Sequence, residues 1–188
     1  MANFARTDEG VRSTGTLVGN VNKVQASQFF EQPPHFFWNC GPESPTEFCP
    51  VPADKCGPDY LKRMVGRGAA VADIDGDGDL DLLFGATGSK PRLLRNDQQL
   101  GHHWLRVDVP GTKGNRSAIG AKIEVETTDA KLSGQVMPTR GYLSQSEMPV
   151  TFGLGNTTTV KTVTVVWPTG ERKTIDAPSV DRVLEVQP

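Results

Sequence analysis

The nine-residue segment Asp73-Ile-Asp-Gly-Asp-Gly-Asp-Leu-Asp81 places an aspartate at every second position. Carboxylates this close together repel one another, even near a protein surface, where solvent weakens the repulsion. A hard divalent cation removes the repulsion, and calcium accepts six to eight oxygen ligands at about 2.3–2.6 Å. The segment therefore predicts a calcium-binding loop. The alternative, a solvated acidic turn without metal, would not require such strict alternation.

The spacing of the loop assigns a role to each acidic residue. Calcium loops of this kind take side-chain ligands from positions 1, 3, 5 and 9, a backbone carbonyl from position 7, and a sharp turn from a glycine at position 6. Gly78 stands at position 6. The predicted metal ligands are the carboxylates of Asp73, Asp75, Asp77 and Asp81 and the backbone carbonyl of Asp79.

The loop resembles the start of an EF-hand but departs from it at two points. An EF-hand requires a bidentate glutamate at position 12 and helices on both sides, whereas position 12 here is Phe84. The flanking segments 68–72 and 80–84 are short apolar runs, which are typical of strands. The loop is therefore expected to close a β-hairpin.

The residues Gly66–Phe84 around the loop resemble an FG-GAP/VCBS-type calcium-binding repeat. Later motifs, in their order along the chain, are similar to the ASPIC/UnbV domain; they occupy residues 92–97, 103–107, 111–121, 141–147, 152–155 and 166–170. The resemblance covers about residues 60–188. It implies a secreted protein with a role in adhesion, matrix or assembly rather than turnover. FG-GAP repeats usually stack as blades of a β-propeller, but this chain shows one clear copy.

The chain is expected to be all-β and to contain three parts. Residues 1–30 are a polar arm or tail, with a candidate strand at 14–21. Residues 31–98 comprise a Cys/Pro-rich segment and the calcium hairpin, with a further strand at 91–97. Residues 99–188 form a β domain of about seven strands, because apolar and polar residues alternate along it. A small β-sandwich or a partly closed barrel would accommodate these strands. The alternating apolar residues are Leu105, Val107 and Val109; Ile119, Ala121, Ile123 and Val125; and Val163, Val165 and Trp167, and further strands are expected at 134–139, 150–154, 172–175 and 183–186.

Charge and hydropathy exclude some partners and favour export. The net charge is −2 and no basic stripe is present, which argues against nucleic acid. No apolar run is long enough to span a membrane, and the first residues lack the apolar core of a signal peptide. A secreted protein, in mature or fragment form, is expected because weak calcium modules work at extracellular calcium concentrations. Glycosylation sequons at Asn115 and Asn156 agree weakly with export.

The three cysteines, Cys40, Cys49 and Cys56, lie in one Pro/Gly-rich segment. In an exported chain they predict one disulfide and one remaining thiol, which could bridge to a neighbouring molecule. The sequence does not decide the pairing. Zinc is disfavoured even with His35 nearby, because the closely spaced ligand pairs of structural zinc sites are missing.

Aromatic residues gather in the same region, at Phe29-Phe30 and Phe36-Phe37-Trp38. They are expected to fill the core of the hairpin domain. The alternative is an aromatic surface for a glycan or a protein partner, to which Tyr142 could contribute.

No known catalytic motif is present in the sequence. His102 and His103 are adjacent in a predicted strand, so they point to opposite faces and are poorly placed to share a metal. Ser144, Ser146 and Glu147 lack a histidine placed to activate a serine. These residues either form a turn whose side-chain oxygens bond the backbone or supply oxygen ligands to a second cation.

The sequence therefore predicts a secreted, non-enzymatic, calcium-binding structural or adhesive β protein. Self-association into an extracellular fibre is a further expectation, based on the N-terminal arm, the odd cysteine and the open edges of the β domain. The alternative is a glycan- or protein-binding module of a larger secreted FG-GAP protein.

Overall fold

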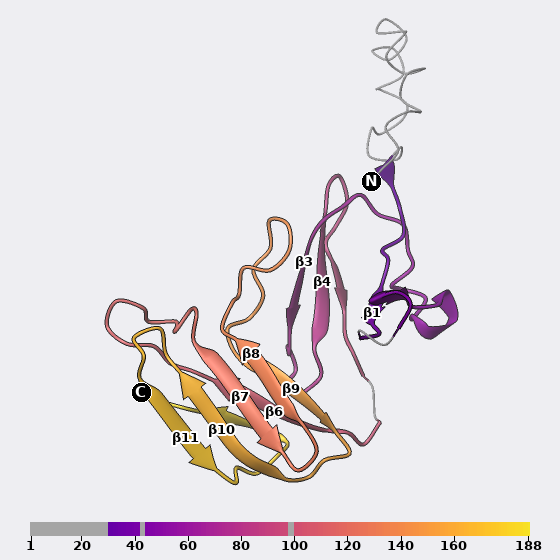
Figure 1. Ribbon diagram of the computed structural model, residues 1–188. Coiled ribbons are helices and arrows are strands. Elements are labelled where there is room, and N and C mark those ends of the chain that lie inside the picture. Colours follow the sequence, from indigo (N-terminus) through magenta and orange to yellow (C-terminus); the bar gives the residue numbers. More distant parts are fainter. Residues whose placement is uncertain (1–29, 42–43, 98–99) are drawn as a thin grey trace, which may run out of the picture. The chain divides into compact units, whose positions relative to one another are not determined.

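The computed structural model describes residues 30–41, 44–97 and 100–188 (Figure 1). The candidate strand at 14–21 and Phe29 lie outside the described residues. The described chain is nearly all β, as predicted, and its one named helix is the three-residue 3-10 helix η3 (Ala53–Lys55). Within the described ranges, no helix has the length and apolar character needed to cross a membrane.

The strands of the described residues form four sheets. A two-stranded sheet pairs β1 with β2, and a three-stranded sheet has the order β3-β4-β5. The remaining sheets have the orders β11-β10-β7-β8 and β12-β6-β9. The strand bounds are β1 (Phe37–Asn39), β2 (Phe48–Pro50), β3 (Gly66–Ala72), β4 (Asp81–Ala86), β5 (Arg92–Leu94), β6 (His103–Asp108), β7 (Lys122–Thr127), β8 (Lys131–Gln135), β9 (Val150–Gly155), β10 (Val160–Val166), β11 (Arg172–Asp176) and β12 (Arg182–Glu185).

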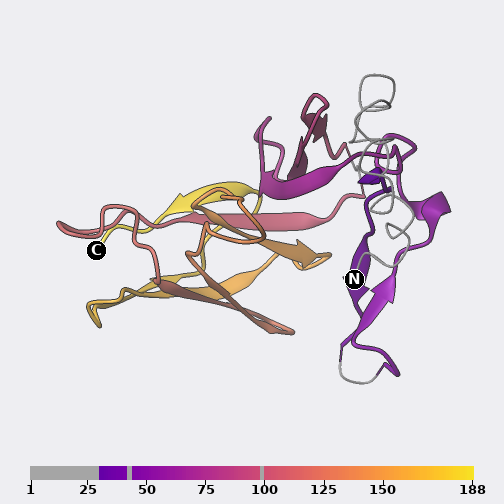
Figure 2. The same ribbon diagram turned by 90° about the horizontal axis from the view of Figure 1, so that it is seen from above.

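The predicted seven strands of the C-terminal domain are present as β6–β12 and form a sandwich. Figure 2 shows its two sheets as separate layers, and the described strands do not close into a barrel. The inward side chains of both sheets share one core, because alternation places every second residue on the same face. This core contains Leu105, Val107, Val109, Ala118, Ala121, Ile123, Val125, Val136, Phe152, Leu154, Val160, Val163, Val165, Trp167, Leu184 and Val186.

Several strand boundaries differ from those predicted. Ile119 was expected to begin a strand, but it is exposed and lies in a turn, and β7 begins only at Lys122. The strand expected at 134–139 instead spans Lys131–Gln135, and Pro138 lies beyond it. A proline has no N–H to donate to a strand ladder, which explains the earlier end. Similarly, the strand expected at 91–97 is limited to Arg92–Leu94.

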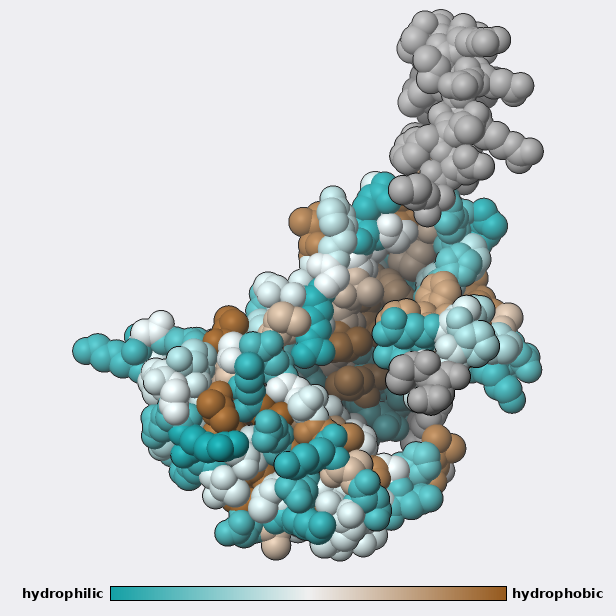
Figure 3. Space-filling view, in the orientation of Figure 1, coloured by the Kyte–Doolittle hydropathy of each residue, from teal (hydrophilic) through white to brown (hydrophobic). Residues whose placement is uncertain are grey.

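The outer face of the four-stranded sheet is polar. Lys122 and Glu124 of β7, and Arg172 and Thr174 of β11, are exposed and lie on this face. Figure 3 shows mostly hydrophilic residues over this part of the molecule, with scattered hydrophobic ones. This is the pattern expected of an antiparallel sheet with one face packed and one face in water.

The chain divides into two compact units. One unit is formed by the described part of residues 1–67 together with residues 85–92. Within it, the Arg92 guanidinium donates hydrogen bonds to the carbonyls of Asp59, Lys62 and Arg63 at 2.7–3.3 Å. Arginine has five N–H donors, so one side chain can satisfy several backbone carbonyls of an irregular segment. The other unit contains residues 68–84 and 93–188.

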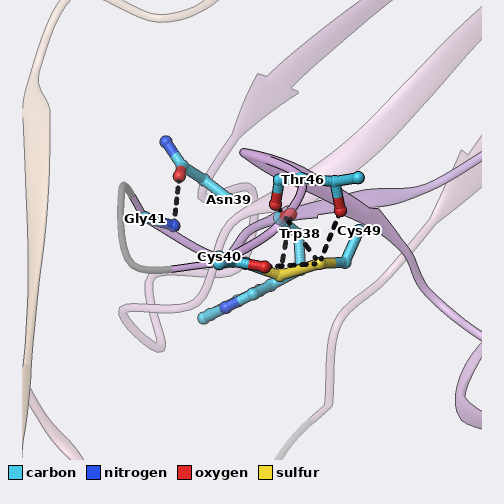
Figure 4. Close-up of a disulfide and its surroundings, with 7 residues drawn as sticks. Trp38, Asn39, Cys40, Gly41, Thr46 and Cys49 are labelled. Atoms are coloured by element: carbon cyan, nitrogen blue, oxygen red, sulfur yellow. Dashed lines mark hydrogen bonds between the residues drawn. A yellow bond between two sulfur atoms is a disulfide. The ribbon is translucent and has the colours of Figure 1, made fainter.

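The β1–β2 hairpin carries a disulfide and exposed aromatic side chains. Cys40 and Cys49 are joined, as the close-up in Figure 4 shows, and Cys56 is free. The expected count of one disulfide and one thiol is therefore confirmed. The expected burial of the aromatic residues is wrong: Trp38 is 65% exposed and Phe37 is 53% exposed. A two-stranded hairpin offers no second layer to cover such side chains.

Candidate metal centre

The acidic loop connects two neighbouring strands of one sheet, β3 and β4. Only eight residues separate Ala72 from Asp81. A parallel pair requires a crossover of a dozen or more residues, so the two strands form an antiparallel hairpin. The predicted β-hairpin is confirmed.

The loop brings three of the predicted ligands together. One carboxylate oxygen each from Asp73, Asp75 and Asp77 lies within 4.8 Å of the others. Asp75 and Asp77 are exposed, whereas the side chain of Asp73 is only 2% exposed. Among the described residues, these three form the one group of acidic, histidine and cysteine side chains close enough to share a metal ion. The group has a buried base and a side open to solvent.

Backbone N–H groups hold two of these carboxylates in place. The Asp73 Oδ1 atom accepts a hydrogen bond from the N–H of Gly76 at 2.7 Å, and Oδ2 accepts from that of Gly78 at 3.2 Å. Asp77 Oδ1 accepts from the N–H of Asp79 at 2.9 Å. Aspartate favours this bonding to nearby backbone in turns. The loop is therefore shaped by its own aspartates.

The predicted ligand Asp81 lies outside this group. It is 1% exposed, and its two oxygens accept hydrogen bonds from the N–H groups of Ile74 at 2.9 Å and Asn96 at 2.8 Å. These bonds connect the loop to the start of β4 and to the segment after β5. Each carboxylate oxygen can accept two interactions. Each Asp81 oxygen can therefore accept one further interaction besides its backbone hydrogen bond.

The pKa of Asp79 reflects the concentration of negative charge in the loop. Burial raises the pKa of its carboxyl group above the usual value, and the negative charges of Asp77, Asp73, Asp81 and Asp75 raise the pKa further. Both effects disfavour the charged form. The protein alone thus leaves the acidic loop short of positive charge.

Two arginines supply part of that charge. The Arg95 guanidinium lies 3.6 Å from Asp75 and 2.6 Å from Asp97, and its side chain is 61% exposed. Arg106, on β6, is largely buried; its Nη1 atom lies 2.7 Å from Asp73 Oδ2, and its Nη2 atom donates to Glu147 Oε2. Arg106 therefore bridges the acidic loop and the segment before β9.

That segment is the Ser144–Glu147 motif, for which the sequence left two roles open. The Ser146 Oγ atom accepts a hydrogen bond from the N–H of Val71, and Glu147 Oε2 accepts from that of Asp73, both at 3.2 Å. Ser144 Oγ donates to the Tyr142 carbonyl at 2.8 Å. The side-chain oxygens of the motif thus form hydrogen bonds with the backbone. This is the first of the two predicted roles; the other was to supply ligands to a second cation. Burial raises the pKa of Glu147, while the Asp73 N–H and Arg106 oppose the rise.

Of the two histidines, His102 is exposed and His103 makes a structural contact. The His103 Nδ1 atom lies 2.7 Å from Asp181 Oδ2, and Asp181 Oδ1 accepts a hydrogen bond from the N–H of Trp104. The bond with His103 lowers the pKa of Asp181. The contacts of Asp181 with His103 and Trp104 hold the turn before β12 against β6, the strand that pairs with β12 in parallel.

Sequence reasoning missed two contacts of the loop. Alternation along β6 placed Arg106 on a face in water, but the loop and Glu147 cover it. A Cβ atom added to Gly78 would overlap the indole of Trp104, so the loop packs directly against that ring. Nothing in the local pattern identifies either contact, because each depends on residues more than 25 positions away. A charged strand residue that the fold buries can therefore be recognised only once its partners are known.

Comparison with known proteins agrees with these features. The model of the FG-GAP repeat matches residues 65–101, which include the acidic loop and both hairpin strands. The model described as ASPIC and UnbV matches residues 111–188, which include most of the sandwich and Glu147. Arg106 lies between the two matched segments.

Curated relatives are longer proteins named Cartilage acidic protein 1. The mouse and human proteins are each 34% identical to this chain over 127 residues, and the Xenopus tropicalis protein is 33% identical over 141 residues. The aligned regions cover 64% or 72% of this chain and about one fifth of each relative: 19% in mouse and human, and 21% in Xenopus tropicalis. The chain thus contains an FG-GAP repeat followed by an ASPIC and UnbV domain.

Proposed function

We propose that this chain is a secreted, non-enzymatic, calcium-binding structural protein in which the ion completes the acidic loop. The observation that carries the proposal is the convergence of Asp73, Asp75 and Asp77 at the tip of a hairpin within an FG-GAP repeat. Calcium in this loop would act on folding stability, because an ion bound only by the native state stabilises it.

The donor set fits a hard cation. All three gathered ligands are carboxylates, which suit calcium better than the softer metals that prefer nitrogen or sulfur. Asp73 is already fixed by two N–H groups, so less ordering is required on binding. In the proposal, the carbonyl of Asp79 and the carboxylate of Asp81 complete the ligand set. Burial raises the pKa of Asp79 most, and the ion would relieve the repulsion from the neighbouring aspartates that adds to this rise.

Three features support a secreted location. Low-affinity calcium sites are occupied at millimolar calcium, a concentration found outside cells. The Cys40–Cys49 disulfide requires an oxidising compartment in most organisms. The curated relatives carry the word cartilage in their name.

Self-association into a fibre is the more specific form of the proposal. Among the described strands, β8, β11, β9 and β12 are the end strands of the two sandwich sheets, and Cys56 has no disulfide partner. Together with an N-terminal arm at residues 1–30, these edges would allow one copy to add a strand to the next. A head-to-tail contact that does not close produces a filament.

Calcium titration by calorimetry, beside negative-stain micrographs, tests both levels of the proposal. The wild-type chain is expected to bind calcium at one site in the micromolar to millimolar range, and an Asp75→Asn/Asp77→Asn variant is expected to lose measurable binding. Fibres should form with calcium and disappear with a chelator. Binding without fibres would reject assembly and keep the calcium site, whereas absence of binding would reject the central proposal.

A glycan-binding module is the second candidate function, and the exposed aromatic side chains of the β1–β2 hairpin favour it. Trp38 is the most exposed of them, and a flat aromatic face stacks well on a sugar ring. Binding to a glycan array that is lost in Trp38→Ala would support this function. An array without binding would count against it.

A further inference from the structure

The Arg106 guanidinium lies between two carboxylates in a largely buried position. One of its terminal nitrogens contacts Asp73, and the other contacts Glu147. The exposed fractions of the three side chains are 12% for Arg106, 2% for Asp73 and 14% for Glu147. Charge-assisted bonds to a planar guanidinium fix the geometry of both carboxylates. The position of Asp73 therefore depends on residues outside the acidic loop.

A guanidinium beside a calcium ligand has two opposite effects. It holds the Asp73 carboxylate in place, and its positive charge repels a cation bound to the same carboxylate. The negative charge of Glu147 offsets the positive charge of Arg106, because Glu147 contacts the other terminal nitrogen of the guanidinium. Glu147 also accepts a hydrogen bond from the backbone N–H of Asp73, so it holds the first residue of the loop directly.

We propose that Glu147 is a positioning residue for the calcium site: it cancels the charge of Arg106 and anchors the backbone of Asp73 without binding the ion. This inference rests on the proposed function of the loop. It assigns to the ASPIC and UnbV domain, which contributes Glu147, a direct part in the calcium affinity of the FG-GAP repeat. The pair of domains would then form one binding unit, in which neither half has the full affinity alone.

The Glu147→Gln variant tests the charge itself. Glutamine keeps the shape of the side chain and an oxygen that can accept the bonds from Asp73 and Arg106, but it carries no charge. Loss of one negative charge near a bound divalent ion is expected to weaken calcium binding by at least about fivefold, because Coulombic attraction is stronger in a partly buried site than in water. The matched control is Glu126→Gln on β7, which removes the same charge from an exposed pair with Lys131. The control is expected to leave the affinity unchanged.

Two further measurements separate the charge effect from a loss of structure. Raising the ionic strength should change the difference in Kd between wild type and Glu147→Gln only slightly, because salt screens buried charges much less than exposed ones. Adding Arg106→Gln to Glu147→Gln should recover part of the lost affinity, because the uncancelled positive charge is then gone. Melting temperatures of all variants in EGTA verify that each is folded.

The outcomes are distinct. Wild type that binds calcium, with a loss in Glu147→Gln that Arg106→Gln partly recovers and no loss in Glu126→Gln, supports the inference. An unchanged Kd in Glu147→Gln, an equal loss in Glu126→Gln, or no recovery of affinity when Arg106→Gln is added to Glu147→Gln overturns it. Wild type that binds no calcium rejects the proposed function itself.

Discussion

Replacing Arg106 with methionine is expected to destabilise the protein by about 3–5 kcal/mol, because it leaves two buried carboxylates without their shared cation. Asp73 and Glu147 are 2% and 14% exposed and lie on the two sides of the guanidinium. Such a loss is a large part of the about 5–15 kcal/mol that stabilises a typical domain. Urea denaturation in EGTA measures the free energy of unfolding in the absence of metal.

Arg95→Met is the matched control for this variant. It removes the same side chain from another pair with a loop aspartate, but Arg95 is 61% exposed and lies 3.6 Å from Asp75. Exposed ion pairs contribute at most about 1 kcal/mol. Equal losses of stability in the two variants would contradict the importance that we assign to the buried position of Arg106.

Replacing Gly78 with alanine is expected to cost about 2–6 kcal/mol, because two unfavourable effects add. The backbone φ of Gly78 is +96°, where a residue with a side chain is strained by about 1–3 kcal/mol. The new Cβ atom would also overlap the Trp104 indole, and overpacking of this kind costs about 1–3 kcal/mol. Thermal and urea unfolding in EGTA measure the loss.

Gly76→Ala separates these two effects. Gly76 has a similar φ of +79°, but a Cβ atom there would meet nothing within 4 Å. The difference in stability between the two variants therefore gives the cost of the contact with Trp104. Equal stability of Gly78→Ala and Gly76→Ala would show that the Trp104 ring moves away at no cost. The close contact between Gly78 and Trp104 would then not contribute to stability.

The features that the sequence predicted well are those that depend on neighbours in the chain. Alternating apolar residues located β6, β7 and β10, because the side-chain period of a strand is a local property. The alternation of Asp73–Asp81 with two glycines likewise predicted a hairpin loop and the clustering of Asp73, Asp75 and Asp77. Strand ends were less accurate: the turn at Ile119 is held by two hydrogen bonds between the Asn115 side chain and the Ile119 backbone, which apolar alternation does not reveal.

The features that could not be predicted depend on tertiary contacts. Arg106 has the pattern of an exposed strand residue, and only the fold brings Asp73 and Glu147 to its sides. Glu147 lies 74 positions from Asp73, and no pattern in the sequence connects them. The aromatic residues Phe37 and Trp38 show the opposite error: a high content of apolar side chains suggested a core, but the hairpin that carries them leaves them exposed.

The hairpin loop and the sandwich belong to the same compact unit, which explains why calcium should affect more than the loop. Residues 68–84 and 93–188 form this unit, and Arg106, Trp104 and Glu147 contact the loop from the sandwich side. An ion that stabilises the loop therefore stabilises contacts made by β6 and by the segment before β9. Unfolding of the whole unit is expected to respond to calcium.

Thermal unfolding with calcium and with EGTA tests the central claim most directly. For wild type, calcium at about one hundred times the Kd should add about 2.7 kcal/mol to the free energy of unfolding. That gain corresponds to a rise in Tm of several degrees for a chain of this size. The Asp75→Asn/Asp77→Asn variant should melt at the same temperature in both conditions. An unchanged wild-type Tm in calcium, or an equal rise in the variant, would contradict the claim that the acidic loop is a calcium site.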